Sequence, residues 1–237
     1  MKKILFTLFI FSFAILSNAQ TPLAQEILSK SIQYHDPQDK WGKEQLVLNL
    51  EETRPNGSIR YTRLEIDLSK DYFFLKQKNG EDEIIRIMQR GECQHQYQGK
   101  SDISEETAQR LRLTCERTAF FRNYYTYLWG LPMKLKDPGT ILHEQVEMSD
   151  YFGKPAYKLK VTYDANVGSD TWYFYFDLKT YALVGYRFYH DETKNDGEYI
   201  LLEDEAVING LRLPKNRKWY MHQDAKFLGT DTLVNGK

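Results

Sequence analysis

The sequence predicts a mainly β fold of the α+β type: a strongly curled antiparallel sheet, an unclosed β-barrel, wrapped over an N-terminal helix and a central helical insertion. Apolar and polar residues alternate in many short segments of both halves of the chain. Turn residues separate these segments at short intervals, which suits antiparallel neighbours. The segments amount to about ten or eleven strands, and a sheet of that size curls or splits instead of staying flat.

The first helix is expected over residues 21–33. Thr21 is a candidate N-cap, Pro22 suits the first turn, and apolar residues recur at helical spacing up to Ile32. The helix should end before Asp36-Pro37, because the residue that precedes a proline disfavours helical backbone. The period then changes to two, and hairpins with turns at residues 55–57 and 79–80 make the first half a β-meander.

A helical insertion is expected between Ile103 and Trp129, where the β pattern stops and apolar residues follow helical spacing. It is rich in aromatic residues, and Phe121 and Tyr125 lie on its apolar stripe. Such a stripe is more often core packing than a ligand contact. We nevertheless take Phe121 and Tyr125 as candidates for the lining of a cavity under the sheet.

The aromatic strands of the second half are the better candidate site. Alternation predicts that one face of residues 172–176 and 184–188 points to the concave side, with Tyr173 and Tyr175 pointing outward. This face would make a continuous apolar lining for a ligand: Trp172, Phe174, Phe176, Val184, Tyr186 and Phe188. The alternative is that these side chains only fill the core, since every curled sheet needs a filled interior.

The N-terminus has the pattern of a cleavable signal peptide over residues 1–19. Lys2 and Lys3 precede an apolar run that is shorter than a membrane-spanning helix, and Ala19 ends a small-residue cleavage motif. Cleavage between Ala19 and Gln20 would leave residues 20–237 as one domain, exported to the periplasm or secreted. No later segment is apolar for long enough to cross a membrane.

The charge composition limits the classes of partner, and the two cysteines predict a disulfide. The chain has 32 basic and 33 acidic residues with both signs interspersed, so nucleic acid is not an expected partner. The only two cysteines, Cys93 and Cys115, would meet an oxidising compartment after export, which favours a structural disulfide between them. A reactive thiol is the alternative, with His95 as the one local base.

Catalytic motifs, metal motifs and cofactor-binding loops are absent from the sequence, so we assign no catalytic residue, no metal ligand and no cofactor. Two dipeptides remain, His35-Asp36 and His190-Asp191, which would bind a metal or orient a base if the fold brought them together. The alternative places His35 at a helix end and His190 at a strand end, with no shared role.

The order of elements resembles the fold of bacterial lipoprotein carriers and receptors of the LolA and LolB type. The resemblance is carried by the Tyr34-to-Pro37 helix end before Trp41, by residues 127–132, by the strands at 172–177 and 183–185, and by residues 209–214. The whole mature chain also resembles a family of exported Bacteroidota proteins of unknown function. The resemblance implies the half-barrel fold and a role in holding acyl chains or other apolar ligands. Carriers of this type have an inward arginine that gates the cavity, which the sequence does not assign to a position here.

The first functional hypothesis is therefore a non-enzymatic carrier or binder of a lipid, an acyl chain or another apolar small molecule. A second is an interaction module that binds another envelope protein through an open sheet edge or an exposed tyrosine face. A third is a secreted hydrolase that uses His35 or His190. The sequence leaves the ligand, the oligomeric state and the openness of the cavity undetermined.

Overall fold

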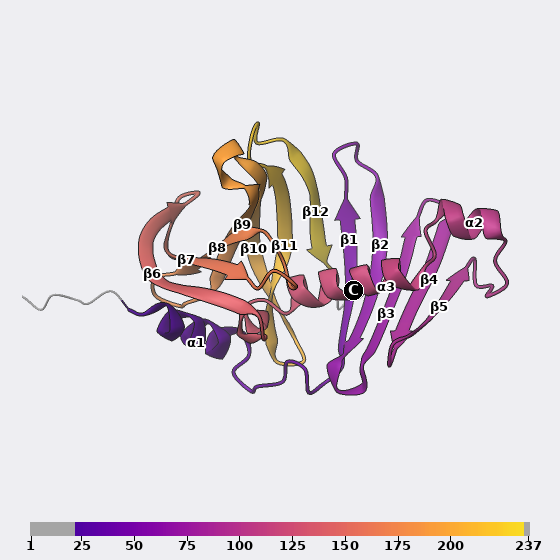
Figure 1. Cartoon of the computed structure of the whole chain (residues 1–237), viewed down its shortest axis with the longest axis horizontal. Helices are drawn as coiled ribbons and strands as arrows, with labels where there is room; N and C mark the ends of the chain where they lie inside the picture. The colour runs from indigo at the N-terminus through magenta and orange to yellow at the C-terminus, as the bar shows by residue number, and fades with distance from the viewer. Residues whose placement is uncertain (1–21, 235–237) are drawn as a thin grey trace, which may run out of the picture.

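The computed structural model describes residues 22–234, so the expected signal peptide and its cleavage site lie outside the described residues. Twelve strands form one antiparallel sheet, where the sequence predicts about ten or eleven (Figure 1). The strands run β1 Leu46–Thr53, β2 Ile59–Asp67, β3 Tyr72–Asn79, β4 Asp82–Gln89, β5 Glu92–Tyr97, β6 Thr140–Tyr151, β7 Lys154–Tyr163, β8 Thr171–Asp177, β9 Leu183–Asp191, β10 Asp196–Ile208, β11 Leu211–Met221 and β12 Phe227–Leu233.

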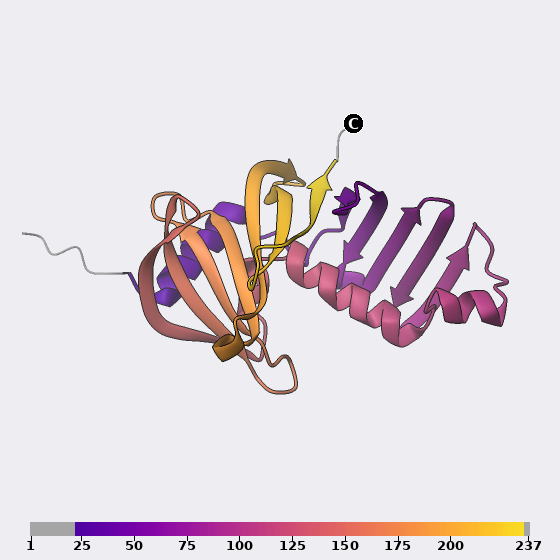
Figure 2. The same ribbon diagram turned by 90° about the horizontal axis from the view of Figure 1, so that it is seen from above.

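The spatial order of the sheet is β5-β4-β3-β2-β1-β12-β11-β10-β9-β8-β7-β6. Two meanders, β1–β5 and β6–β12, therefore meet where the first strand pairs with the last. Seen from above, β6–β12 curl into a trough while β1–β5 form a flatter wing (Figure 2). Strands β5 and β6 are the two free edges, so the barrel does not close and the predicted fold class is confirmed.

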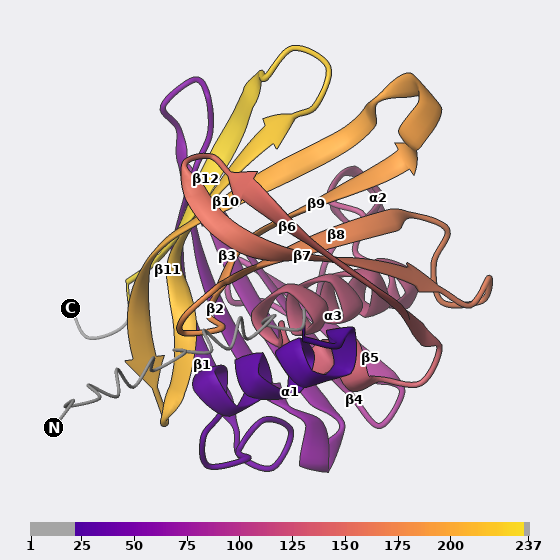
Figure 3. The same ribbon diagram turned by 90° about the vertical axis from the view of Figure 1, so that its left-hand side faces the viewer.

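Helix α1, Ala24–His35, lies across one end of the trough and contacts β6 and β11 (Figure 3). It begins three residues later than expected, with Leu23 as its N-cap and no side-chain cap. It ends at His35, as the Asp36-Pro37 sequence predicts. Its inward residues Ala24, Ile27 and Leu28 are buried in a core that includes residues of β7–β11.

The helical insertion is two helices instead of one: α2, Glu105–Arg110, and α3, Cys115–Trp129. Arg86 of β4 donates to the carbonyl oxygens of Leu111 and Arg112, which α2 leaves unpaired where it ends. The Thr114 hydroxyl then accepts from the Arg117 backbone N–H and starts α3. Helix α3 lies along the concave side of β1–β5, and its last turn reaches the trough (Figures 1 and 2).

Candidate functional site

Two adjoining cavities lie beside α3, with volumes of about 680 and 530 Å³. They share Phe120, Tyr124, Tyr127, Asp170 and Trp172, so they form one continuous cleft between α3 and the rim of the trough. We call it the α3 cleft. Each cavity is of the size that holds a small molecule in other proteins.

The apolar walls of the α3 cleft are mostly aromatic. Phe120, Tyr124 and Tyr127 are spaced by four and three residues on α3, so they share one helix face. Trp172 of β8 stacks on Phe188 of β9 with ring centroids 4.6 Å apart. Tyr124 remains 38% exposed and Phe120 50% exposed. The cleft is therefore an accessible apolar surface and not a filled core.

One end of the cleft carries a row of charged residues across four neighbouring strands. The strand register places Arg60 of β2 opposite Glu52 of β1, Glu52 opposite Asp231 of β12, and Asp231 opposite Arg217 of β11. Glu52, Arg60 and Asp231 line the 530 Å³ cavity. The two carboxylates thus face each other at the junction of the two meanders.

Glu52 is buried and well satisfied. Its oxygens accept from Arg60 Nε at 2.5 Å and Nη2 at 2.8 Å, and from the Tyr125 hydroxyl at 3.0 Å. The Thr62 hydroxyl also donates to it. Burial acts to raise the pKa of Glu52, but the hydrogen bonds and charge of Arg60 outweigh it and hold that pKa below its usual value.

Asp231 has fewer hydrogen-bond donors around it than Glu52. It accepts one side-chain hydrogen bond, from Trp219 Nε1 at 2.9 Å, and forms no ion pair with any residue among 22–234. Burial, and then the negative charge of Glu52, raise the pKa of Asp231 to about 6. The carboxyl group of Asp231 therefore has its pKa close to neutral pH, and such shifted pKa values are common at functional sites.

Arg217 is buried, with 2% of its surface exposed, and contacts Leu128, which lines the 530 Å³ cavity. Its guanidinium is 3.6 Å from the ring centroid of Trp129, and Nη2 donates to the Leu128 carbonyl oxygen at 3.1 Å. The Tyr186 hydroxyl is also buried and lies close enough to the Arg217 guanidinium for the two groups to interact. Arg217 is an inward arginine that contacts the end of α3.

The two histidine–aspartate dipeptides are far apart. His35 Nδ1 donates to the Arg212 carbonyl oxygen at 2.6 Å, and Nε2 accepts from the Leu183 N–H at 2.9 Å. His190 lies on β9 seven residues beyond Leu183, the residue that His35 contacts. Seven residues of a strand span roughly 23 Å. Both nitrogens of His35 are engaged in joining α1 to β9 and β11, so the structure gives it a packing role.

His190 lies at the rim of the α3 cleft, where Nδ1 contacts Asp170 Oδ1 at 2.9 Å. That hydrogen bond raises the pKa of His190. Glu198 lines the same cavity, and burial raises its pKa. Among residues 22–234 no group of three or more histidine, cysteine, aspartate or glutamate side chains is arranged to hold a metal ion.

The expected cavity lining is found only in part. Trp172 and Phe188 line the α3 cleft. Phe174, Phe176 and Tyr186 are fully buried in the core with residues of α1. Phe121 and Tyr125 point to the other side of α3, against the core of the β1–β5 wing. The helix face that meets the cleft is the adjacent one, with Phe120, Tyr124 and Tyr127.

The placement of Val184 is a correction. Val184 packs against the outer cluster of Tyr151, Tyr173 and Tyr175, not on the concave side. A β-bulge between β8 and β9 pairs Phe176 with Leu183 and Tyr175 with Gly185, so Val184 is an extra residue and the alternation shifts by one. Gly185 leaves space for the Tyr151 ring, since a Cβ there would lie 2.0 Å from that ring.

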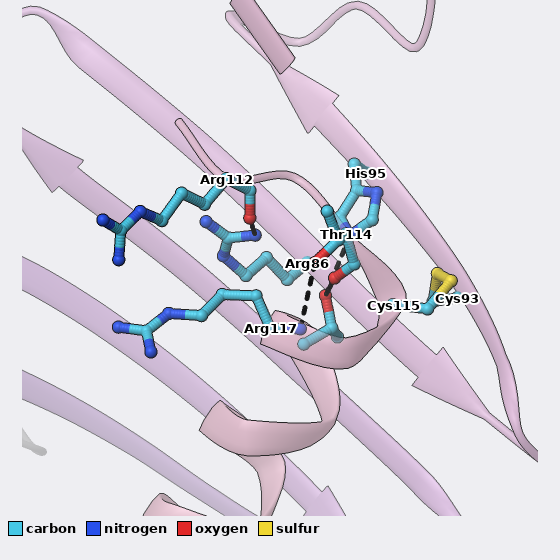
Figure 4. The surroundings of a disulfide bond; sticks show 8 residues. Arg86, Cys93, His95, Arg112, Thr114, Cys115 and Arg117 are labelled. Atoms are coloured by element: carbon cyan, nitrogen blue, oxygen red, sulfur yellow. Dashed lines mark hydrogen bonds between the residues drawn. A yellow bond between two sulfur atoms is a disulfide. The ribbon is translucent and has the colours of Figure 1, made fainter. Parts of the chain in front are cut away.

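Cys93 and Cys115 form a disulfide with Cα atoms 5.5 Å apart (Figure 4). The bond joins edge strand β5 to the first residue of α3. Beside it, His95 Nε2 contacts the Thr118 hydroxyl at 2.8 Å. The disulfide thus fixes the N-terminal end of the helix that forms one wall of the cleft.

Comparison with solved structures finds proteins of similar fold. A LolA superfamily protein from Nitrosomonas europaea is 13% identical and has a TM-score of 0.50, with 91% of this chain and 93% of that chain covered. A putative outer membrane lipoprotein-sorting protein domain from Vibrio parahaemolyticus is 10% identical, covers 90% of this chain and 94% of its own, and has a TM-score of 0.47. The first of these confirms the LolA-type fold expected from the sequence.

No helix within residues 22–234 is long and apolar enough to span a membrane. No curated protein matches the chain. The model of the "Family of unknown function (DUF6503)" matches residues 2–236, which is nearly the whole sequence, and the chain belongs to this family.

Proposed function

We propose that this protein is an exported, non-enzymatic carrier or binder that holds a lipid, an acyl chain or another apolar molecule in the α3 cleft. The observation that carries the proposal is the aromatic lining of a continuous cavity, with Phe120 and Tyr124 exposed and Trp172 half-buried. Burial of apolar ligand surface contributes roughly 25 cal/mol per Å² before the cost of ordering the ligand. An open aromatic cleft next to a filled core is therefore a favourable place for an apolar chain.

Export is part of this proposal and has support from two features. The N-terminal sequence has the charged, apolar and small-residue regions of a signal peptide. The Cys93–Cys115 disulfide suits an oxidising compartment. The likeness in fold to a LolA superfamily protein is consistent with a carrier role, although a fold by itself does not determine function.

The test is native mass spectrometry of the mature protein purified from its own cell envelope, followed by lipid extraction of any bound mass. The proposal predicts a mass excess that is released into organic solvent and identified as a lipid or another apolar molecule. A clean apo mass, together with no uptake of fluorescent fatty acids, would contradict it.

A second candidate function is the binding of another envelope protein at edge strand β6. This strand has one unpaired edge, and Met148 on it is 71% exposed. An unpaired strand edge is a template for strand addition. In the register of the β6–β7 hairpin, the backbone N–H of Met148 points to the free edge and not to β7. Replacement of Met148 by Pro should therefore abolish capture of such a partner while fatty acid uptake remains; unchanged capture would exclude β6 as the interface.

A further inference from the structure

Apolar burial does not account for the acidic groups of the α3 cleft. Asp231 lines the 530 Å³ cavity with one hydrogen-bond donor, Trp219 Nε1, and lies opposite a second carboxylate, Glu52. In an antiparallel pair, Cβ atoms of directly opposite residues are about 5 Å apart, and like charges at that spacing repel. The site therefore has a carboxylate whose charge is incompletely compensated.

The cations around Asp231 do not pair with it. Arg60 gives two hydrogen bonds to Glu52. Arg217 lies opposite Asp231 in the strand register, yet its guanidinium stacks on Trp129 and donates to a carbonyl oxygen of α3. Arg54 lines the same cavity and forms no ion pair within residues 22–234; its charge and that of Arg217 only partly offset the burial and the Glu52 charge that raise the pKa of Asp231.

The remaining walls are aromatic and suit a positive charge. Tyr124, Trp172 and Trp219 line the cavity that Asp231 faces. The faces of tyrosine and tryptophan rings attract cations, with a contribution of about 0.5–2 kcal/mol that grows when the cation loses water. The Tyr124 hydroxyl lies near Asp231. Burial raises the pKa of Tyr124 most, and the negative charge of Asp231 raises it further.

From this juxtaposition we infer that the ligand of the α3 cleft carries a positively charged nitrogen, held beside Asp231 and against the rings of Tyr124 and Trp219. The inference rests on the proposed function and deepens it, because it names the class of ligand: an amphiphile with an ammonium head group. The aromatic surface of Phe120 and Trp172 would take the apolar chain, and the carboxylate end of the cavity would take the head group.

The protonation of Asp231 gives this inference a second consequence. Its pKa of about 6 means that the carboxylate is largely neutral at pH 5 and largely charged at pH 7. A bound cation stabilises the charged form, so binding and proton release are linked. Glu198 and His190 line the same cavity with raised pKa values, and loss of a proton from either also makes the cavity more negative. Affinity for a cationic ligand should therefore rise between pH 5 and pH 7, while affinity for a neutral ligand should change little.

The experiment compares three amphiphiles with the same chain at concentrations below micelle formation: dodecyltrimethylammonium, dodecyl sulfate and a neutral dodecyl ether. Isothermal titration calorimetry of the mature protein at pH 7 should give about tenfold tighter binding of the cationic probe than of the anionic one. Asp231→Asn should remove most of that preference. Glu203→Gln, which removes a carboxylate paired with Lys218 on the other face of β10, is the matched control.

Arg54→Gln provides a second readout that does not depend on the stability of the Asp231 variant. Arg54 is exposed, so its replacement should leave the fold intact. It should strengthen binding of the cationic probe and weaken binding of dodecyl sulfate. Equal affinities for all three probes, or an unchanged preference in both variants, would overturn the inference and leave the proposed function standing. Binding of none of the probes would count against the proposed function itself.

Discussion

Glu52 and Asp231 face each other across the β1–β12 pair, which joins the two meanders of the sheet. Among the residues that the structure describes, Glu52 has Arg60, Thr62 and Tyr125 as side-chain donors, whereas Asp231 has Trp219 alone. The junction therefore depends on one well-satisfied carboxylate beside one that is poorly satisfied. This asymmetry gives opposite expectations for the two residues.

Replacement of Asp231 by Asn should stabilise the protein at neutral pH. The pKa of Asp231 is about 6 when folded, above the roughly 3.9 of an unfolded aspartate. The folded state thus binds more protons between these values, so wild-type stability falls as pH rises from about 4 to 6 and is level above that. Urea unfolding should show Asp231→Asn more stable by about 1–2 kcal/mol at pH 7.5. The gain should nearly vanish at pH 4.5; a variant less stable than wild type at pH 7.5 would be inconsistent with this account.

Replacement of Glu52 by Gln should destabilise the fold strongly. It leaves Arg60 charged and partly buried without its carboxylate, which typically costs about 3–5 kcal/mol. Glu51→Gln is the matched control, because Glu51 is the neighbour on the opposite face of β1 and should change stability by less than about 0.5 kcal/mol. Equal effects of the two substitutions in urea unfolding would show that the Arg60 pair is not needed.

His35→Ala should loosen the contact of α1 with the sheet. The substitution leaves the Arg212 carbonyl and the Leu183 N–H without partners, at about 1–3 kcal/mol for each buried group. Burial also lowers the pKa of His35, so the unfolded state binds the proton more readily and stability contributed by His35 is lost as pH falls below about 6.5. Hydrogen exchange should show faster exchange of the Leu183 amide in the variant. His143→Ala, which removes a single contact with Thr162, serves as the control, and unchanged exchange at Leu183 would refute the packing role.

Removal of the disulfide should release the start of α3. Cys93 and Cys115 are 22 residues apart, and closing a loop of this length contributes about 3 kcal/mol in the chain-entropy model. The Cys93→Ser, Cys115→Ser double variant should unfold at lower urea concentration and lose amide protection first in the initial turns of α3. Loss of protection confined to β8 and β9 would argue against this role of the bond.

The sequence predicts the regular elements correctly because they depend on local chemistry. The predictions that are wrong concern features that depend on tertiary packing. Alternation and turn residues predict the meanders, and Asp36-Pro37 predicts the end of α1. The alternation cannot reveal the bulge that turns Val184 outward, because the bulge depends on the close approach of Tyr151 to Gly185. Nor does helical spacing decide between Phe121 and Phe120 as the residue facing the cleft, since both α3 faces are aromatic.

The sequence also does not predict the row of charged residues at one end of the α3 cleft, for a related reason. Arg60, Glu52, Asp231 and Arg217 come from distant parts of the sequence and meet only because the first strand pairs with the last. The sequence does contain one usable signal: Glu52 continues the inward phase of β1, whose other inward residues are Leu46, Leu48 and Leu50. A charged residue in such a phase is buried, and buried charges need partners.

The most direct test of the account is to locate a bound acyl chain by tryptophan quenching. The chain has four tryptophans, and Trp129 and Trp219 are kept because they contact Arg217 and Asp231. Comparison of wild type with Trp172→Phe, in the α3 cleft, and with Trp41→Phe, in the loop before β1, gives the quenching of each of these two residues. A brominated fatty acid should quench Trp172 strongly and leave Trp41 unquenched. Equal quenching of both, or quenching of neither at saturating fatty acid, would contradict the claim that the α3 cleft binds the apolar ligand.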